Sequence, residues 1–208
     1  MNHLPIITDL GITTLDLAEN SISLISSRGF SGLPNLESID LSKNRLDDDS
    51  LSHHLFSNLT RLRRLNLDDN QLTRIPLLPP SLEELKMNDN KITRLTPHSF
   101  KGPLRRVQYL RLDSNRFRSL PLGLPRSLQE LRMRDNQLQE VPEGVLSELA
   151  KLRVLDLSHN LLHEGDISNR AWVKLTLAVF AEHNPFYTSS LSWFSLELSS
   201  LRRNGPSD

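Results

Sequence analysis

The chain has 208 residues, 37% hydrophobic and 24% charged, and its 25 basic and 25 acidic side chains balance to a formal net charge of zero. This composition is typical of one globular domain with a sizeable core, and it gives no general attraction to nucleic acid or anionic membranes. The absence of cysteine excludes disulfides, thiolate metal sites and a thiol nucleophile. No apolar run is long enough to span a bilayer.

The N-terminal segment, "MNHLPIITDL", has no basic region followed by an apolar stretch. It therefore does not read as a signal peptide. Two interpretations follow: an intracellular protein, or a mature or truncated piece of a secreted one.

From residue 12 onward one pattern recurs, L-x-x-L-x-L-x-x-N-x-L, with Ile, Val, Met or Phe in place of some leucines. It runs from "ITTLDLAENSI" to "LRVLDLSHNLL", and "TLAVFAEHNPF" fits as a looser eighth copy. The spacings between the repeated asparagines are 24, 26, 20, 25, 21, 24 and 24 residues, for Asn20, Asn44, Asn70, Asn90, Asn115, Asn136, Asn160 and Asn184. The pattern is identified as a leucine-rich repeat. It predicts one domain over residues 1–208 with about eight repeats, an α/β solenoid shaped as a horseshoe with a parallel β-sheet on its concave face.

Each part of the repeat has a physical role. In L-x-L, alternate residues of a short strand point to opposite faces, so the leucines face inward and the x residues face outward. One repeat cannot bury its leucines alone, so repeats stack around a shared core. The asparagine amide both donates and accepts, so it can satisfy backbone groups of neighbouring coils where the chain leaves the strand. A catalytic or ligand-binding role for these asparagines is the disfavoured alternative.

The return segments are of two kinds. Long repeats carry a bulky apolar residue, Phe30, Phe56 or Leu146, which we expect to fill the outer core beneath a helical turn. The two short repeats carry "IPLLPPSL" and "LPLGLPRSL" instead. Because proline fixes φ and cannot donate to a ladder, these segments predict thinner, extended, polyproline-like return paths.

The outward residue in the middle of each L-x-L forms a predicted column on the concave face. The column is acidic at its ends and basic at its centre: Asp16, Asp40, Asn66, Lys86, Arg111, Arg132, Asp156 and Phe180. Arg63, Arg64 and Arg134 extend the basic patch, and Tyr109 is the aromatic side chain at its centre. Eight strands about 4.8 Å apart would span ~35 Å, which suits an extended partner better than a small ligand. We predict that this patch binds a protein partner.

The competing interpretation is that these charges form an ordinary solvated face. Carboxylates interleave with the cations, at Glu83, Glu84, Asp89, Asp113, Glu130 and Asp135. Such neighbours can pair for only ~0–1 kcal/mol each. The same interleaving makes nucleic acid a poor candidate partner.

Three further motifs are weaker. "NLT" makes Asn58 a candidate glycosylation site near the start of a strand. "LDDDSLSHHLF" (46–56) lacks the spacing of known calcium or zinc motifs and is best read as a polar loop with a capped turn. His159 and His183 fall in one column with His163 nearby, which makes weak metal binding a disfavoured alternative. We predict no metal, cofactor or catalytic residue, since no nucleophile elbow, zincin motif or P-loop is present.

The alternation of short and long repeats, with "P-x-x-LP-x-SL-x-x-L" in the short ones, resembles the small leucine-rich repeat proteoglycans of extracellular matrix. The resemblance covers roughly residues 4–184, and "HEGDISNRAWVKL" (163–175) looks most like the podocan and extracellular matrix protein 2 branch. The resemblance implies a secreted glycoprotein that binds collagen or another matrix protein through its concave face.

The chain departs from this family at its ends. The N-terminal cysteine cluster is absent, and "NPFYTSSLSWF" (184–194) resembles a C-terminal flanking motif with Thr188 and Ser190 where cysteines are usual. We interpret residues 185–208 as a cap-like segment and tail. The missing cysteines favour the alternative of a cytoplasmic repeat scaffold. Bacterial ubiquitin ligases carry similar short repeats and are another alternative. Their repeats are uniform in length and accompany a catalytic domain with a cysteine, whereas this chain mixes two repeat lengths and has no cysteine. The ectodomain of a membrane receptor is a further alternative, which would need a membrane-spanning helix that this sequence does not contain.

Overall fold

The computed structural model describes residues 7, 9–52, 54–95, 99–100, 106–163 and 178–185. The expectations for residues 1–6, for most of the 163–175 motif and for nearly all of the cap-like segment fall outside these ranges. Within them, no helix is long and apolar enough to cross a membrane.

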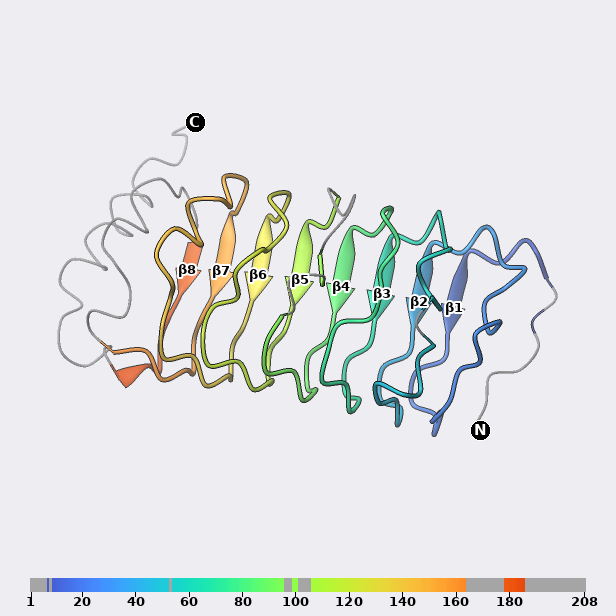
Figure 1. Ribbon diagram of the computed structural model, residues 1–208, viewed down its shortest axis with the longest axis horizontal. Coiled ribbons are helices and arrows are strands. Elements are labelled where there is room, and N and C mark those ends of the chain that lie inside the picture. The colour runs from blue at the N-terminus through green and yellow to red at the C-terminus, as the bar shows by residue number, and fades with distance from the viewer. Residues whose placement is uncertain are drawn as a thin grey trace, which may run out of the picture.

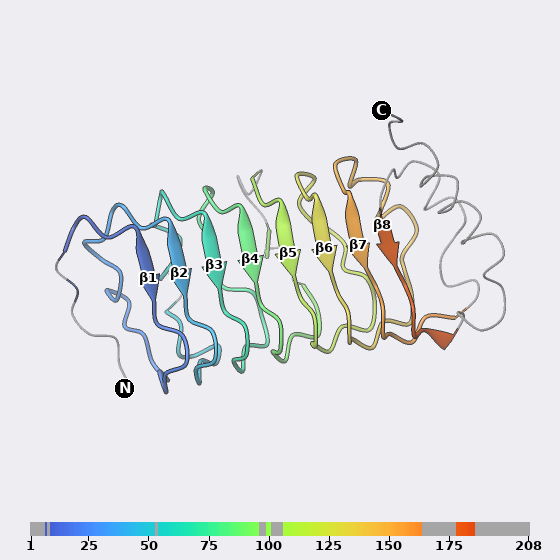
Figure 2. The same ribbon diagram turned by 180° about the vertical axis from the view of Figure 1, so that it is seen from behind.

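Eight three-residue strands form one parallel sheet in chain order, one strand per coil (Figure 1). They are β1 (Thr14–Asp16), β2 (Ser38–Asp40), β3 (Arg64–Asn66), β4 (Glu84–Lys86), β5 (Tyr109–Arg111), β6 (Glu130–Arg132), β7 (Val154–Asp156) and β8 (Ala178–Phe180). The view from behind shows the same row of strands with the return segments running along the other side (Figure 2). The predicted leucine-rich repeat solenoid with a parallel concave sheet is confirmed.

The leucines of each repeat build the core because the strands are in register. The middle residues of neighbouring strands pair directly, as in Leu85 with Leu110 and Leu110 with Leu131. These three side chains are fully buried. The loose eighth copy follows the same rule, since Val154 pairs with Ala178 and Asp156 with Phe180.

The repeated asparagines join consecutive coils, as the sequence predicts. The buried amide of Asn115 donates to the carbonyl oxygen of Met87 in the preceding coil at 2.9 Å. Its oxygen accepts the backbone N–H of Ile92 at 3.0 Å. Equivalent bonds to the preceding coil recur at each of the other asparagines from Asn44 to Asn184. Asn20 differs, because among the described residues its amide donates only to Leu17 and Ala18 of its own coil.

A feature that the sequence pattern did not predict lies just before each asparagine. The preceding residue has φ between 51° and 58° in all eight coils, although none of the eight is glycine. This left-handed conformation is unfavourable by about 1–2 kcal/mol for ordinary residues. It turns the backbone N–H toward the next coil, as in Asp89, which donates to the carbonyl of Asp113 at 3.0 Å. The regular stacking of the coils therefore imposes this conformation.

The return segments have the two predicted kinds. Phe30 and Phe56 are buried and stacked, with ring centroids 5.9 Å apart, and Leu146 is buried in a later coil. These side chains lie under tight turns rather than α-helices, closed by bonds such as Leu33 N–H to the Phe30 carbonyl at 3.2 Å. In the return segments of the short repeats no aromatic residue fills this layer, and the buried apolar residues there include Ile75, Leu120 and Leu124. The two short repeats thus differ from the long ones in the side chains that fill this outer layer.

Candidate functional site

The predicted concave column exists as a continuous row of outward side chains. Strand pairing places Asn66 beside Lys86, Lys86 beside Arg111, and Arg111 beside Arg132. The ends of the row are the acidic Asp16, Asp40 and Asp156, and Phe180, which is 46% exposed. The row therefore has the charge order that the sequence predicts.

Three adjacent cations repel one another, so the centre of the row needs compensation. Glu130 supplies most of it. The Nε of Arg111 donates to Glu130 Oε1 at 3.2 Å, and the Nε of Arg132 donates to the same oxygen at 2.7 Å. The Glu130 side chain is only 14% exposed, whereas those of Arg111 and Arg132 are 32% and 41% exposed. Glu130 thus acts as a largely covered anchor that holds two partly exposed guanidinium groups side by side.

The other members of the predicted patch surround this anchored pair. The Lys86 ammonium lies 3.6 Å from Glu84. Tyr109 is in register between Glu84 and Glu130 and is 37% exposed. Arg63 lies just before β3 and Arg64 is its first residue, and both are exposed. No carboxylate of the described residues lies within 4.0 Å of either side chain.

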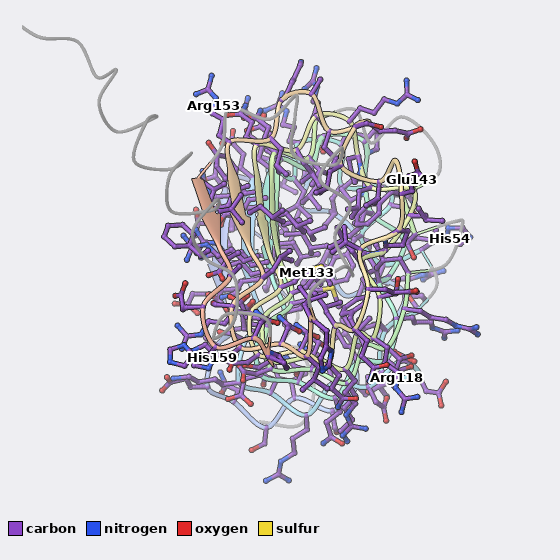
Figure 3. The ribbon with its side chains drawn as sticks, turned by 90° about the vertical axis from the view of Figure 1, so that its left-hand side faces the viewer. His54, Arg118, Met133, Glu143, Arg153 and His159 are labelled. Carbon is purple, nitrogen blue, oxygen red and sulfur yellow. The ribbon has the colours of Figure 1, made fainter. Side chains whose placement is uncertain are left out.

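Arg134 lies apart from the row. It follows β6, where its Nε is 3.1 Å from Asp135 and its guanidinium is 3.3 Å from the ring of His159. It belongs to the margin where the strands end. Figure 3 shows His159 at that end of the strands and Arg153 at the opposite end.

This margin carries a second ladder, made by carboxylate and amide side chains. Asp68 accepts the backbone N–H of Asn88 at 2.6 Å, Asn88 accepts that of Asp113 at 2.8 Å, and Asp113 accepts that of Arg134 at 2.8 Å. Burial raises the pKa of Asp68. Burial raises the pKa of Asp113 to about 6. The negative charge of Asp156 also raises this pKa, whereas the hydrogen bond from the Arg134 N–H lowers it. The ionised Asp113 carboxylate is therefore destabilised in the folded protein.

Asp113→Asn is expected to stabilise the protein at pH 7.5 by about 1 kcal/mol, after allowing for the partial exposure of the group. The folded pKa, about 6, lies above the ordinary value of 3.8, so the wild type loses stability as pH rises through this window. The amide can still accept the Arg134 N–H, as Asn88 does in the preceding coil. Urea unfolding at pH 3.5 and 7.5 checks this, with exposed Asp69→Asn as control. An advantage of equal size at both pH values would contradict the account.

The weaker motifs have structural roles or exposed positions. Asn58 is exposed in a turn before β3, so its side chain is accessible. In the 46–56 loop, Asp47 accepts the Ser50 N–H at 2.9 Å, and Asp48 accepts the Thr73 N–H at 3.0 Å. The loop is thus a capped turn tied to the next coil, as predicted.

The two predicted column histidines do stack, with ring centroids of His159 and His183 4.1 Å apart. The nitrogens of His159 already face charged groups, Asp135 at 3.6 Å and the Arg134 guanidinium. Among the described residues no group of three or more His, Cys, Asp or Glu side chains is placed to hold a metal ion.

Comparison with known proteins supports the repeat assignment along the chain. The family description "Leucine rich repeat" matches residues 10–46 and 126–178, and a second description, "Leucine Rich Repeat", matches residues 61–80 and 81–103. Mimecan of Mus musculus is 37% identical over 111 residues, which cover 52% of this chain and 36% of mimecan. Lumican of Homo sapiens is 32% identical over 142 residues, covering 57% and 42% of the two chains. The matched regions span less than half of these relatives.

Podocan of Mus musculus is also similar, at 30% identity over 143 residues that cover 56% of this chain and 23% of podocan. The resemblance to the podocan and extracellular matrix protein 2 branch stays a prediction, since mimecan and lumican match at similar identity.

Solved structures share the fold. A chain of the octameric complex of latrophilin 3, Unc5D and FLRT2 covers 93% of this chain and 67% of its own length, with a TM-score of 0.69 and 25% identity. A leucine-rich repeat protein of Leptospira interrogans aligns over 90% of this chain and 53% of its own chain, with a TM-score of 0.72 and 25% sequence identity.

Proposed function

The chain belongs to the leucine-rich repeat proteins, within the small leucine-rich proteoglycan family. We propose that it is a non-enzymatic, secreted module that binds a matrix protein through its concave face. Collagen is the leading candidate for this partner. The observation that carries this proposal is the anchored pair, Arg111 and Arg132 on Glu130. A preformed pair of guanidinium groups beside Tyr109 loses little side-chain freedom when a partner binds. Arginine and tyrosine are also enriched in protein interfaces.

The shape of the sheet supports an extended partner. Eight strands in register offer a row of about 35 Å with charges of both signs. Part of the cationic charge is already neutralised by Glu84 and Glu130, so long-range attraction is modest. A partner must instead fit the order of charges along the row, which favours specificity over raw affinity.

Binding of the purified protein to immobilised fibrillar collagen at two salt concentrations tests the proposal. Saturable binding that weakens at higher salt is expected, because partly exposed charges are screened. Salt-insensitive or absent binding by folded protein would contradict it.

Secretion is the second part of the proposal. Asn58 is exposed and lies in an N-x-T sequon, so a secreted protein should carry a glycan there. With a secretion signal supplied in animal cells, we expect the wild type to gain mobility on gels after glycosidase treatment, whereas Asn58→Gln should run at the deglycosylated position without treatment. Unmodified wild-type protein in the medium would contradict glycosylation at this site.

A further inference from the structure

A second basic surface lies along the rim of the sheet where the strands begin, which we call the N-terminal rim. Arg61, Arg106 and Lys151 each lie three residues before the first residue of β3, β5 and β7. In the two coils between them the same position holds Ser81 and Ser127. Since the strands are in register, the five positions form one column across adjacent coils.

The alternation in this column follows the alternation of repeat lengths. Ser81 Oγ donates to the carbonyl of Leu62 at 2.7 Å, and Ser127 Oγ donates to the carbonyl of Val107 at 2.7 Å. The short repeats thus use this position to bond to the coil before them. From β3 to β7 the long repeats leave it exposed, with a cation, on every second coil. Neighbouring cations in the column are therefore about 10 Å apart, and the three span roughly 20 Å.

The N-terminal rim is strongly positive although the whole chain is neutral. Between β3 and β7 the described part of this rim has six exposed cations, Arg61, Arg63, Arg106, Arg126, Lys151 and Arg153. The carboxylates beside them are Glu83, which is half-buried, and Glu148, so six positive and two negative charges leave a local charge of +4. Arg126 lies 3.7 Å from Glu148. No carboxylate of the described part of the chain lies within 4.0 Å of the other five cations. Arg61 donates to the side-chain oxygen of Asn35 at 2.7 Å. Arg63, Arg106, Lys151 and Arg153 are available, in contrast to the anchored pair on the concave face.

We propose that the N-terminal rim binds a linear sulfated polysaccharide. A row of cations at regular intervals fits a chain that presents anionic groups along its length, whereas a single small anion would meet only one of them. Guanidinium groups bind tetrahedral oxyanions through paired hydrogen bonds, and five of the six cations are arginines. A row of this length can engage several anionic groups at once, so individually weak contacts add up.

The choice of polyanion has two grounds. The columns that form the N-terminal rim contain no aromatic side chain among the described residues, so they offer no platform for stacking bases of single-stranded nucleic acid. The choice of a sulfated polysaccharide over duplex nucleic acid rests on the extracellular location in the proposed function.

Immobilised heparin is the probe for this surface. The charge reversal Arg106→Glu/Lys151→Glu should weaken binding at least about tenfold and make the remaining binding less sensitive to salt. The matched control is Arg116→Glu/Arg118→Glu, which changes the same charge at exposed positions in a return segment. Arg118 lies on the side away from the strands (Figure 3). The control should change affinity by less than about twofold. Equal losses in the two variants, or no loss in the first, would overturn the proposal.

Two further arms identify the class of ligand and separate the sites. Desulfated heparin should bind much more weakly than heparin, whereas duplex DNA bound as tightly as heparin would overturn the assignment to a sulfated polysaccharide. Arg111→Glu/Arg132→Glu should keep heparin binding, because the anchored pair lies on the concave face. The rim variant should in turn keep collagen binding. Loss of collagen binding alone therefore counts against the proposed function, and loss of heparin binding alone reports on the N-terminal rim.

Discussion

Asn115→Ala is expected to lower the free energy of unfolding by about 3–5 kcal/mol. The buried amide bonds the carbonyl of Met87 and the N–H of Ile92, both in the preceding coil. It also donates to Leu112 and Asp113 of its own coil. Alanine would remove the partners of the Met87 carbonyl and the Ile92 N–H, and each unsatisfied buried group is unfavourable by about 1–3 kcal/mol. The carbonyls of Leu112 and Asp113 would keep the bonds that they accept from Asn136 and Asp89. Urea unfolding followed by circular dichroism measures the change.

The chain offers a matched control for this substitution. Asn20 has the same place in the first coil, but it is exposed, and its bonds within the described ranges stay inside that coil. Asn20→Ala should therefore reduce stability by less than about 1 kcal/mol. Equal shifts of the urea midpoint for the two variants would contradict a role of the asparagines in joining coils. Because stacked repeats are coupled to their nearest neighbours, Asn115→Ala can also broaden the transition.

The double reversal Arg111→Glu/Arg132→Glu is expected to weaken binding to fibrillar collagen by at least about 100-fold. It removes both guanidinium groups of the anchored pair and leaves three carboxylates close together, since Glu130 remains. The matched control is Arg116→Glu/Arg118→Glu, with the same change of charge outside the concave face. Surface plasmon resonance on immobilised collagen compares the three proteins.

Crowding of carboxylates could also disturb the fold, so Arg111→Gln/Arg132→Gln accompanies the reversal. The neutral variant removes the repulsion among the cations and should keep the circular dichroism of the wild type. We expect it to lose binding by about tenfold. Wild-type affinity in both folded variants would place the binding surface elsewhere.

The fold could be predicted closely because its determinants are local and repeated. The spacing of leucines fixes which side chains face inward, and the asparagine marks where each strand ends. The alignment of eight copies therefore gives the register, including Asp156 beside Phe180 in the loose copy. The buried Phe30 and Phe56 were predictable for the same reason, since each long repeat needs a bulky residue for its outer layer.

The candidate site could be predicted only in outline. The sequence placed Lys86, Arg111 and Arg132 in one column, but the anchoring by Glu130 depends on side-chain geometry across two coils. The sequence groups Arg134 with the patch because of its charge, although Arg134 lies two residues after the column position and therefore beyond the end of β6. The basic column of the N-terminal rim did have a signal in the alignment, a cation three residues before alternate strands. That signal is visible only when long and short repeats are compared position by position.

Photo-crosslinking from the centre of the concave face tests the account most directly. A photoreactive phenylalanine analogue in place of Tyr109, which is 37% exposed on β5, would report contacts there. The same analogue in place of Leu122, which is 66% exposed in a return segment, is the control. The account predicts crosslinks to fibrillar collagen from position 109 and none above background from position 122. Crosslinks from position 122 alone, or from neither position under conditions where the protein binds collagen, would contradict binding through the concave face.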